Sequence, residues 1–353
     1  MTSKQTSISS ARIDVAGTLD DAIEECFRRG WTDGLPVVPP TEAKVLAFLD
    51  ASGRDPSDII GIEPVRSRVV TAEKIAINAV MAGCRPDYMP VVLAAVEAMV
   101  DPAYSLHGSS ASTGGSAPMV IVNGPVRNKL GFQSGYNLFA GGPDFRPNAT
   151  VGRALRLILI NVLGNIPGVL DLSTTGYGGK FSFCFAEDEE NSPWAPLHVE
   201  KGFASDASTV TVSASQSPLQ VRHTRSGTPE AILDTAAQGM SSLGPTNGEV
   251  YLVLPYEHLK VFNAAGWSKD QLRDYLHSKA RRTAQEWADA NMAELPSPGA
   301  EQEMVPVLKE PRSLIPVAGG GPGGSTCAII PRWSGGNTAF SVTREIDTSG
   351  IAE

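Results

Sequence analysis

The spacing of apolar residues along the chain predicts several amphipathic helices. Thr18 and Asp21 are typical of a capping box, and the apolar positions after them predict a helix that ends near Gly30. Asn148 is a good N-cap for a helix over 149–163, which has a broad apolar face. Other helices are expected over 41–49, 71–82, 91–100 and 257–264, and after Thr228 and Ser268.

Short apolar runs between turn formers predict strands. They lie at 119–122, 181–185, 209–212, 250–254 and 314–317. Alternation of helix and strand in the second half favours an α/β fold with mixed sheet layers, flanking helices and many loops. We expect a flexible tail over 1–17 and two α/β domains, 18–220 and 228–353, because turn formers fill 216–227. The first domain would carry the site.

Composition narrows the range of partners. The 353 residues include 35 glycines and 26 prolines, more than an average chain, but 42% are hydrophobic, enough for a folded core. The net charge is −9 and basic residues do not cluster, which argues against nucleic acid. There is no apolar run of membrane-spanning length and no secretory signal, so we expect a cytoplasmic protein without a membrane partner.

Cysteine is the first candidate for chemistry. The cysteines are Cys26, Cys84, Cys184 and Cys327. They form no C-x-x-C pair, which predicts free thiols. Cys84 is the candidate nucleophile, because it follows a helix-ending Gly83 and precedes Arg85, whose charge favours a thiolate. A buried cysteine that closes the turn is an equally good interpretation, since a helix C-terminus raises a thiol pKa.

An acidic run is the second candidate. Glu187-Asp188-Glu189-Glu190 follows the strand expected at 181–185, and His198 comes soon after it. Such residues can act as a general acid and base or as ligands of a divalent metal. The alternative is a solvated acidic turn, although Trp194 indicates that a carboxylate lies against apolar surface, where its pKa rises. Glu187 and His198 are therefore the predicted pair, a divalent metal is possible, and no other cofactor is predicted.

Arginines and glycines could bind an anionic substrate. Arg153 and Asn148 lie at the start of the helix over 149–163, where an anion would meet a guanidinium and backbone N–H groups, and Arg85 would be a second clamp. Surface arginines are the alternative. Two glycine-rich segments could bind an anion through backbone N–H groups, but neither has nucleotide-binding spacing. Their candidate residues are Gly114, Gly115, Gly320 and Gly321.

Four sequence words carry a family resemblance. They are GWTDGLP at 30–36, NAVMAGCRP at 78–86, NATVGRA at 148–154 and FCFAE at 183–187. Together they resemble an uncharacterised bacterial family of roughly this length with thiol-redox or "thioredoxin" labels, associated with small UGSC-type (seleno)proteins. The resemblance extends from about Thr18 to the glycine-rich C-terminal region. It implies a thiol-bearing partner subunit, with Cys84 as the motif cysteine.

Three hypotheses of function follow. The first is a cysteine-dependent enzyme or enzyme subunit that acts on a small anionic organic substrate through Cys84, by nucleophilic or redox chemistry. The second is a metal-assisted lyase or hydrolase that uses the region of Glu187 and His198. The third is a non-catalytic subunit that binds a UGSC-type partner or further copies of itself.

Overall fold

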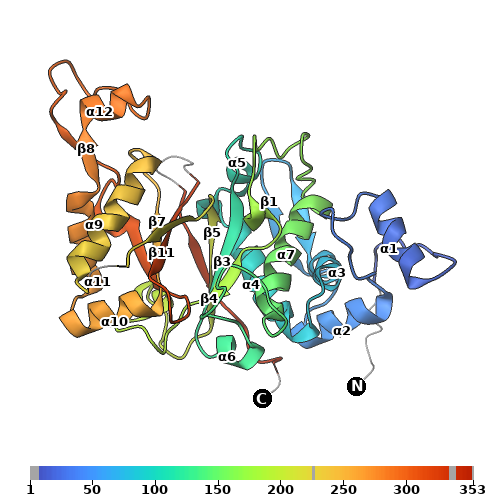
Figure 1. The fold of residues 1–353 in the computed structure, drawn as a ribbon. Helices are drawn as coiled ribbons and strands as arrows, with labels where there is room; N and C mark the ends of the chain where they lie inside the picture. The colour runs from blue at the N-terminus through green and yellow to red at the C-terminus, as the bar shows by residue number, and fades with distance from the viewer. Residues whose placement is uncertain (1–7, 225–226, 334–338, 352–353) are drawn as a thin grey trace.

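Two four-stranded sheets lie face to face in the centre of the molecule, and helices cover the outer face of each (Figure 1). The computed structural model describes residues 8–224, 227–333 and 339–351. The fold is α/β with mixed sheets and flanking helices, as the alternation of helix and strand predicts. An apolar core between the sheets joins the two halves, with two further cores between each sheet and its helices.

The first sheet has the strand order β12-β5-β3-β4. Its strands are β3 (Ala117–Asn123), β4 (Cys184–Ala186), β5 (Thr209–Ser215) and β12 (Val342–Glu345). β3 and β4 are parallel, and the other pairs are antiparallel. Its main helices are α3 (Ala72–Ala82), α4 (Met89–Val100) and α7 (Arg146–Asn161). α4 packs on β5 and β12, and α7 packs on β3 and β4.

The second sheet has the strand order β10-β7-β11-β6. Its strands are β6 (Leu219–Arg222), β7 (Val250–Leu254), β10 (Leu314–Ala318) and β11 (Thr326–Pro331). β7 and β10 are parallel, and the other pairs are antiparallel. Its main helices are α9 (Pro229–Met240), α10 (Tyr256–Ala265) and α11 (Lys269–Lys279). α9 packs on β6 and β11.

The two sheets repeat one pairing pattern. In each, a central strand is parallel to one neighbour and antiparallel to the other, which pairs in turn with an antiparallel edge strand. The edge strands are exchanged: β6 follows β5 of the first sheet but pairs with β11, and β12 follows β11 but pairs with β5. Each half therefore completes the sheet of the other.

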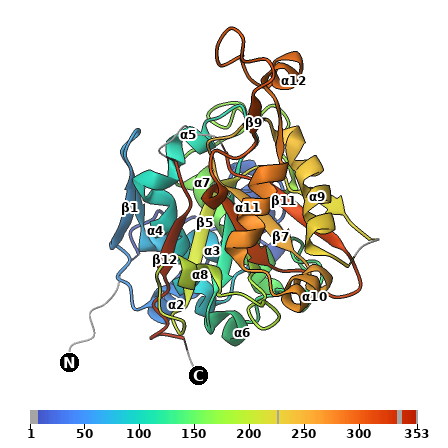
Figure 2. The ribbon, with the colours of Figure 1, turned by 90° about the vertical axis from the view of Figure 1, so that its left-hand side faces the viewer.

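The remaining elements surround this sandwich. They are α1 (Leu19–Arg28), α2 (Glu42–Ser52), β1 (Ile59–Glu63), β2 (Arg68–Thr71), α5 (Leu106–Ser110), α6 (Val126–Leu130), α8 (Leu197–Glu200), β8 (Arg281–Thr283), α12 (Ala284–Asp289) and β9 (Met304–Pro306), with short 3-10 turns at 86–88, 102–104, 178–180, 241–243 and 311–313. The β8–β9 hairpin and α12 stand away from the second half (Figure 2).

Some of the predicted ends of helices and strands are confirmed, and others are wrong. The capping box at Thr18 and the helix-ending Gly83, with φ of 87°, are confirmed. Asn148 is not an N-cap, because α7 begins at Arg146. The strand expected at 181–185 covers only Cys184–Ala186, because Phe181 follows a 3-10 turn. The turn-rich stretch 216–227, predicted as a domain boundary, contains β6.

Among the described residues, no single helix has the length and apolar composition to cross a bilayer. One pair, Pro86–Val100 with Pro102–Ser110, meets those two criteria only when taken together, and it is bent by 72°.

Candidate functional site

Asn123, Glu187 and Thr209 form a row at the carboxyl end of the parallel pair β3–β4. Side chains of β3 alternate between the helices and the space between the sheets, and Asn123 faces the space between the sheets. The register of β3 with its neighbours puts Glu187 on one side of Asn123 and Thr209 on the other. Carboxyl ends of strands are where open α/β sheets bind ligands.

The Glu187 carboxylate is buried and anchored on one side only. Its Oε2 accepts hydrogen bonds from Asn123 Nδ2 at 2.6 Å and from the Leu197 backbone N–H at 2.8 Å. The same Asn123 amide donates to Glu189 Oε1 at 2.9 Å. The His198 ring is also fully buried, and its Nδ1 lies 4.0 Å from Glu189 Oε1. The structure therefore brings the predicted pair, Glu187 and His198, into one cluster.

Four polar atoms of this cluster are buried without a hydrogen-bond partner. They are Glu187 Oε1, Asn123 Oδ1, His198 Nδ1 and Thr209 Oγ1. Buried polar atoms are nearly always paired, so four unpaired atoms in neighbouring residues need an explanation. Water or a polar ligand could bond to them.

Burial raises the pKa of the Glu187 carboxyl, and the nearby negative charge of Glu189 acts in the same direction. The charge of Lys269 and the hydrogen bonds from Leu197 and Asn123 oppose this shift. A carboxyl with a raised pKa retains its proton closer to neutral pH, as a general acid must.

Arg127 forms ion pairs with two further acids of the run, Glu189 and Glu190. Its buried guanidinium lies 3.0 Å from both Glu189 Oε1 and Glu190 Oε1, and donates to the Glu187 carbonyl at 2.8 Å. The hydrogen bond from Arg127 lowers the pKa of Glu190 to about 2. These contacts hold the acidic run in place at the edge of the site. Only its outer residue, Glu190, is the solvated acid that the alternative interpretation expected.

Residues 191–200, here called the cover segment, close the site from the side of the second half. Trp194 Nε1 donates to the Trp267 carbonyl at 2.6 Å. The buried Lys269 ammonium donates to the Ala195 carbonyl at 2.8 Å and to Glu200 Oε2 at 2.6 Å. Contacts with α11 and the segment before it therefore hold the cover segment over Glu187.

The cluster does not form a recognisable metal centre. Within the described ranges, no group of three or more His, Cys, Asp or Glu side chains is arranged to hold a metal ion. Glu187, Glu189 and His198 thus share a cluster without forming a ligand set.

Cys84 lies apart from this cluster, against α7. Its buried Sγ donates to the Thr150 carbonyl at 3.3 Å. Burial raises the pKa of the Cys84 thiol to about 12. The hydrogen bond to Thr150 and the charges of Arg146 and Arg153 oppose that shift, and Arg85 forms an ion pair with Asp87. In this conformation the thiol is protonated at neutral pH, which disfavours nucleophilic attack.

The predicted anion-binding residues are engaged in contacts within the chain. Arg153 forms a two-point ion pair with Asp33, at 2.8 Å for each bond, and clamps the GWTDGLP segment onto α7. The Asn148 amide bonds to the backbone N–H and carbonyl of Gln133, next to the end of β4. Arg153 and Asn148 therefore bind the chain's own loops in this structure.

The glycine-rich segments lie at opposite ends of the sheets. Gly114 and Gly115 precede β3, and a Cβ at Gly115 would lie 2.9 Å from the Gly176 Cα. Gly320 and Gly321 follow β10, near the site, because the Asp188 N–H donates to the Ala318 carbonyl at 2.9 Å. Of the two segments, the one after β10 thus begins next to the residue that follows Glu187.

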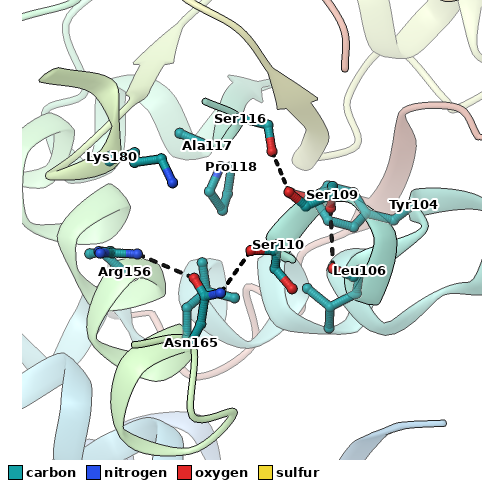
Figure 3. A pocket seen from close by; sticks show the side chains of 11 residues that line it. Tyr104, Leu106, Ser109, Ser110, Ser116, Ala117, Pro118, Arg156, Asn165 and Lys180 are labelled. Carbon is teal, nitrogen blue, oxygen red and sulfur yellow. Dashed lines mark hydrogen bonds between the residues drawn. The ribbon is translucent and has the colours of Figure 1, made fainter. Parts of the chain in front are cut away.

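A small pocket lies beside the first glycine-rich segment, between α5, the start of β3 and α7 (Figure 3). Arg156 and Lys180 line it from one side and Ser109 and Ser110 from the other, and Asn165 lies between them, bonded to both Arg156 and Ser110. Both cations bond to the Asp171 carboxylate, at 3.3 Å and 2.7 Å. The interior has room for about one water molecule.

Sequence reasoning missed Asn123, Thr209 and Arg127. Asn123 and Thr209 each end or begin a strand, and only the strand register places them beside Glu187. Arg127 lies in α6 and reaches the acidic run across the chain. The available signal was a polar residue at the carboxyl end of the apolar run 119–122.

Comparison of the chain with protein-family models, curated proteins and solved structures gave no match. The resemblance to the thiol-redox family therefore stays a prediction. The function proposed below depends on the geometry of the site alone.

Proposed function

We propose that this chain is an enzyme that transfers protons to or from a small organic substrate, with Glu187 as general acid–base and His198 as the second proton-transfer group. The observation that carries this proposal is the set of four unpaired polar atoms in one buried row at the carboxyl ends of β3 and β4. Strained or unsatisfied polar groups and shifted pKa values gather at functional sites.

Each residue has a role that its contacts support. Asn123 and the Leu197 N–H hold Glu187 Oε2, which leaves Oε1 free to exchange a proton. A raised pKa lets Glu187 carry that proton near neutral pH. Because Glu187 and His198 have no exposed surface, the cover segment must move before a substrate can reach them. Burial raises the pKa of the Cys84 thiol to about 12, so almost no thiolate is present at neutral pH, which favours this proposal over a thiol mechanism.

The test is exchange of carbon-bound hydrogen for deuterium in D2O, followed by proton NMR with a panel of 2-hydroxy, 3-hydroxy and 2-amino acids. We expect Glu187→Gln to lower exchange or elimination about 100-fold or more, the usual loss when a general acid–base is removed. Glu230→Gln, at an exposed position of α9, is the matched control and should keep full activity.

Cys84→Ala separates the two mechanisms. It should retain turnover if Glu187 carries the chemistry. Loss of turnover in Cys84→Ala together with full turnover in Glu187→Gln would favour the thiol mechanism instead. Circular dichroism of each variant distinguishes a lost reaction from a lost fold.

A further inference from the structure

Lys269 is a buried cation that has no role in the reaction proposed above. It is the first residue of α11, in the second half of the molecule, and only 6% of it is exposed. The helix dipole disfavours a cation at this end of a helix, and burial of an ammonium is costly unless it is paired. The acceptors of Lys269, the Ala195 carbonyl at 2.8 Å and Glu200 Oε2 at 2.6 Å, both belong to the cover segment.

The cover segment is held at two adjacent peptide groups, one from each half of the molecule. Lys269 bonds to the Ala195 carbonyl, and Glu187 Oε2 accepts from the Leu197 N–H at 2.8 Å. Only Pro196 lies between these two groups, and its ring fixes φ, at −59° here. A movement that breaks the Lys269 contact is therefore expected to displace the Leu197 N–H from Glu187 as well.

Glu200, at the end of α8, completes the attachment. Its carboxylate bonds to Lys269 through Oε2 and lies 3.1 Å from Arg273 Nη2 through Oε1. Arg273 is fixed to the second sheet, because its Nε donates to the Leu314 carbonyl at 3.0 Å. These contacts place α8 beside α11 (Figure 2). The Glu200 side chain is 24% exposed, so water can replace its ion pairs when the segment moves.

Lys269 also acts on the charge of Glu187. The charged and titratable groups around Glu187 are Glu189 and His198 of the cluster, Arg127 of α6, which bonds to the Glu187 carbonyl, and Lys269 of α11. Burial raises the pKa of the Glu187 carboxyl, and the charge of Lys269 opposes this shift. Without that charge, Glu187 would retain its proton to higher pH.

We propose that Lys269 is a positioning residue that holds the cover segment closed over Glu187. Release of its ammonium from Ala195 and Glu200 opens the segment to substrate. This inference rests on the proposed function, because the segment needs to open only if Glu187 meets a substrate. The second half of the molecule thereby controls access to the chemistry of the first.

Hydrogen–deuterium exchange of backbone amides in the full chain, measured by mass spectrometry, reports opening of the cover segment without a substrate. Lys269→Met keeps the length of the side chain and removes the ammonium. Peptides that contain 195–200 should then exchange about tenfold faster or more, as expected for lost hydrogen bonds to a charged group. Lys279→Met, at the exposed far end of α11, is the matched control and should leave this exchange unchanged.

The second readout is the pH dependence of the deuterium exchange into substrate. Lys269→Met should move the midpoint of this profile to higher pH, because it removes a charge that lowers the pKa of Glu187. A purely structural role of Lys269 would leave the midpoint unchanged. If Lys269→Met does not fold, Glu200→Gln weakens the same contact from the cover segment and should also speed its amide exchange.

Two results would overturn the role of Lys269. One is an equal rate of amide exchange over 195–200 in wild type and Lys269→Met. The other is an acceleration that is as large in peptides of α4 as in the cover segment, since the variant would then destabilise the whole fold. Failure of the proposed reaction looks different: Glu187→Gln would keep full turnover, whereas amide exchange would still show whether Lys269 holds the segment.

Discussion

The parallel pair β3–β4 of the first sheet and the parallel pair β7–β10 of the second occupy matching positions, yet their carboxyl ends differ in chemistry. β3–β4 leads into Asn123 and Glu187, both buried and polar. β7–β10 leads into Pro255 and Gly319, and a Cβ at Gly319 would come within 2.7 Å of the Leu138 side chain. One half thus carries the candidate chemistry, and the other supplies backbone packing and the anchor of the cover segment.

The side chains that β5 and β11 turn toward the space between the sheets also differ in polarity. β5 turns Thr209, Thr211 and Ser213 toward the space between the sheets, whereas β11 turns Ala328 and Ile330 toward it. A hydroxyl buried between two sheets without a hydrogen-bond partner lowers the free energy of unfolding. A polar inner face is therefore expected only where it has a function. The two sheets therefore share a pairing pattern but not the side chains on their inner faces. The predictions below compare changes in one half with changes in the other.

Separating the halves should have the largest effect. Expressed alone, residues 1–224 or 227–353 should fail to fold, because β5 would lack β12 and β11 would lack β6. The loss would amount to the whole stability of a domain, about 5–15 kcal/mol. Co-expressed, the two fragments should assemble, as measured by co-purification through a tag on one of them. A first fragment that folds alone, with a cooperative melting transition, would contradict the exchange of strands.

Replacing an apolar side chain by a polar one on the inner face of β11, and the reverse on β5, should have the next largest effect on stability. Ile330→Thr buries a hydroxyl without a partner and should lower the free energy of unfolding by about 2–3 kcal/mol. Thr209→Val removes a hydroxyl that is already unpaired and should change it by less than about 1 kcal/mol. Urea unfolding measures both. If Thr209→Val is as costly as Ile330→Thr, a buried water bonds to that hydroxyl.

Glu187→Gln should have a smaller effect that depends on pH. A carboxyl with a raised folded-state pKa binds its proton more tightly in the native than in the unfolded protein, so wild-type stability falls as pH rises above the unfolded pKa. Glutamine does not titrate. The variant should therefore gain stability relative to wild type between pH 5 and pH 8.

Unfolding at both pH values, with Glu230→Gln as the control, measures this gain. A difference between wild type and Glu187→Gln that stays constant with pH would mean that Glu187 does not titrate in this range.

The smallest difference between the halves is expected in the reactivity of their buried thiols, Cys84 and Cys327. Burial raises the pKa of Cys84 in the first half and of Cys327 in the second, each to about 12. Both thiols should react with Ellman's reagent at pH 8 about 100-fold or more slowly in native than in unfolded protein, because almost no thiolate is present. A single fast thiol that disappears in Cys84→Ala would restore the nucleophile hypothesis.

Part of the fold could be predicted because it depends on neighbours in the chain. The broad apolar face of α7 and the cap at Gly83 follow from helical spacing and from the positive φ that glycine tolerates. β6 could not be predicted, because its four residues pair with β11, about a hundred positions away. Glu187 is a buried carboxylate, but Trp194, on which that expectation was based, packs on Phe262 of the second half.

The α/β class, the apolar alternation of the strands and the acidic run with Glu187 at its head can be predicted from the chain alone, because they follow from local patterns. Which side chains share the site depends on tertiary packing. Strand register placed Asn123 and Thr209 beside Glu187, α11 brought Lys269 to the cover segment, and Arg153 was paired with Asp33. Contacts between distant segments depend on packing that no local pattern specifies, so burial and pKa were decided at that level.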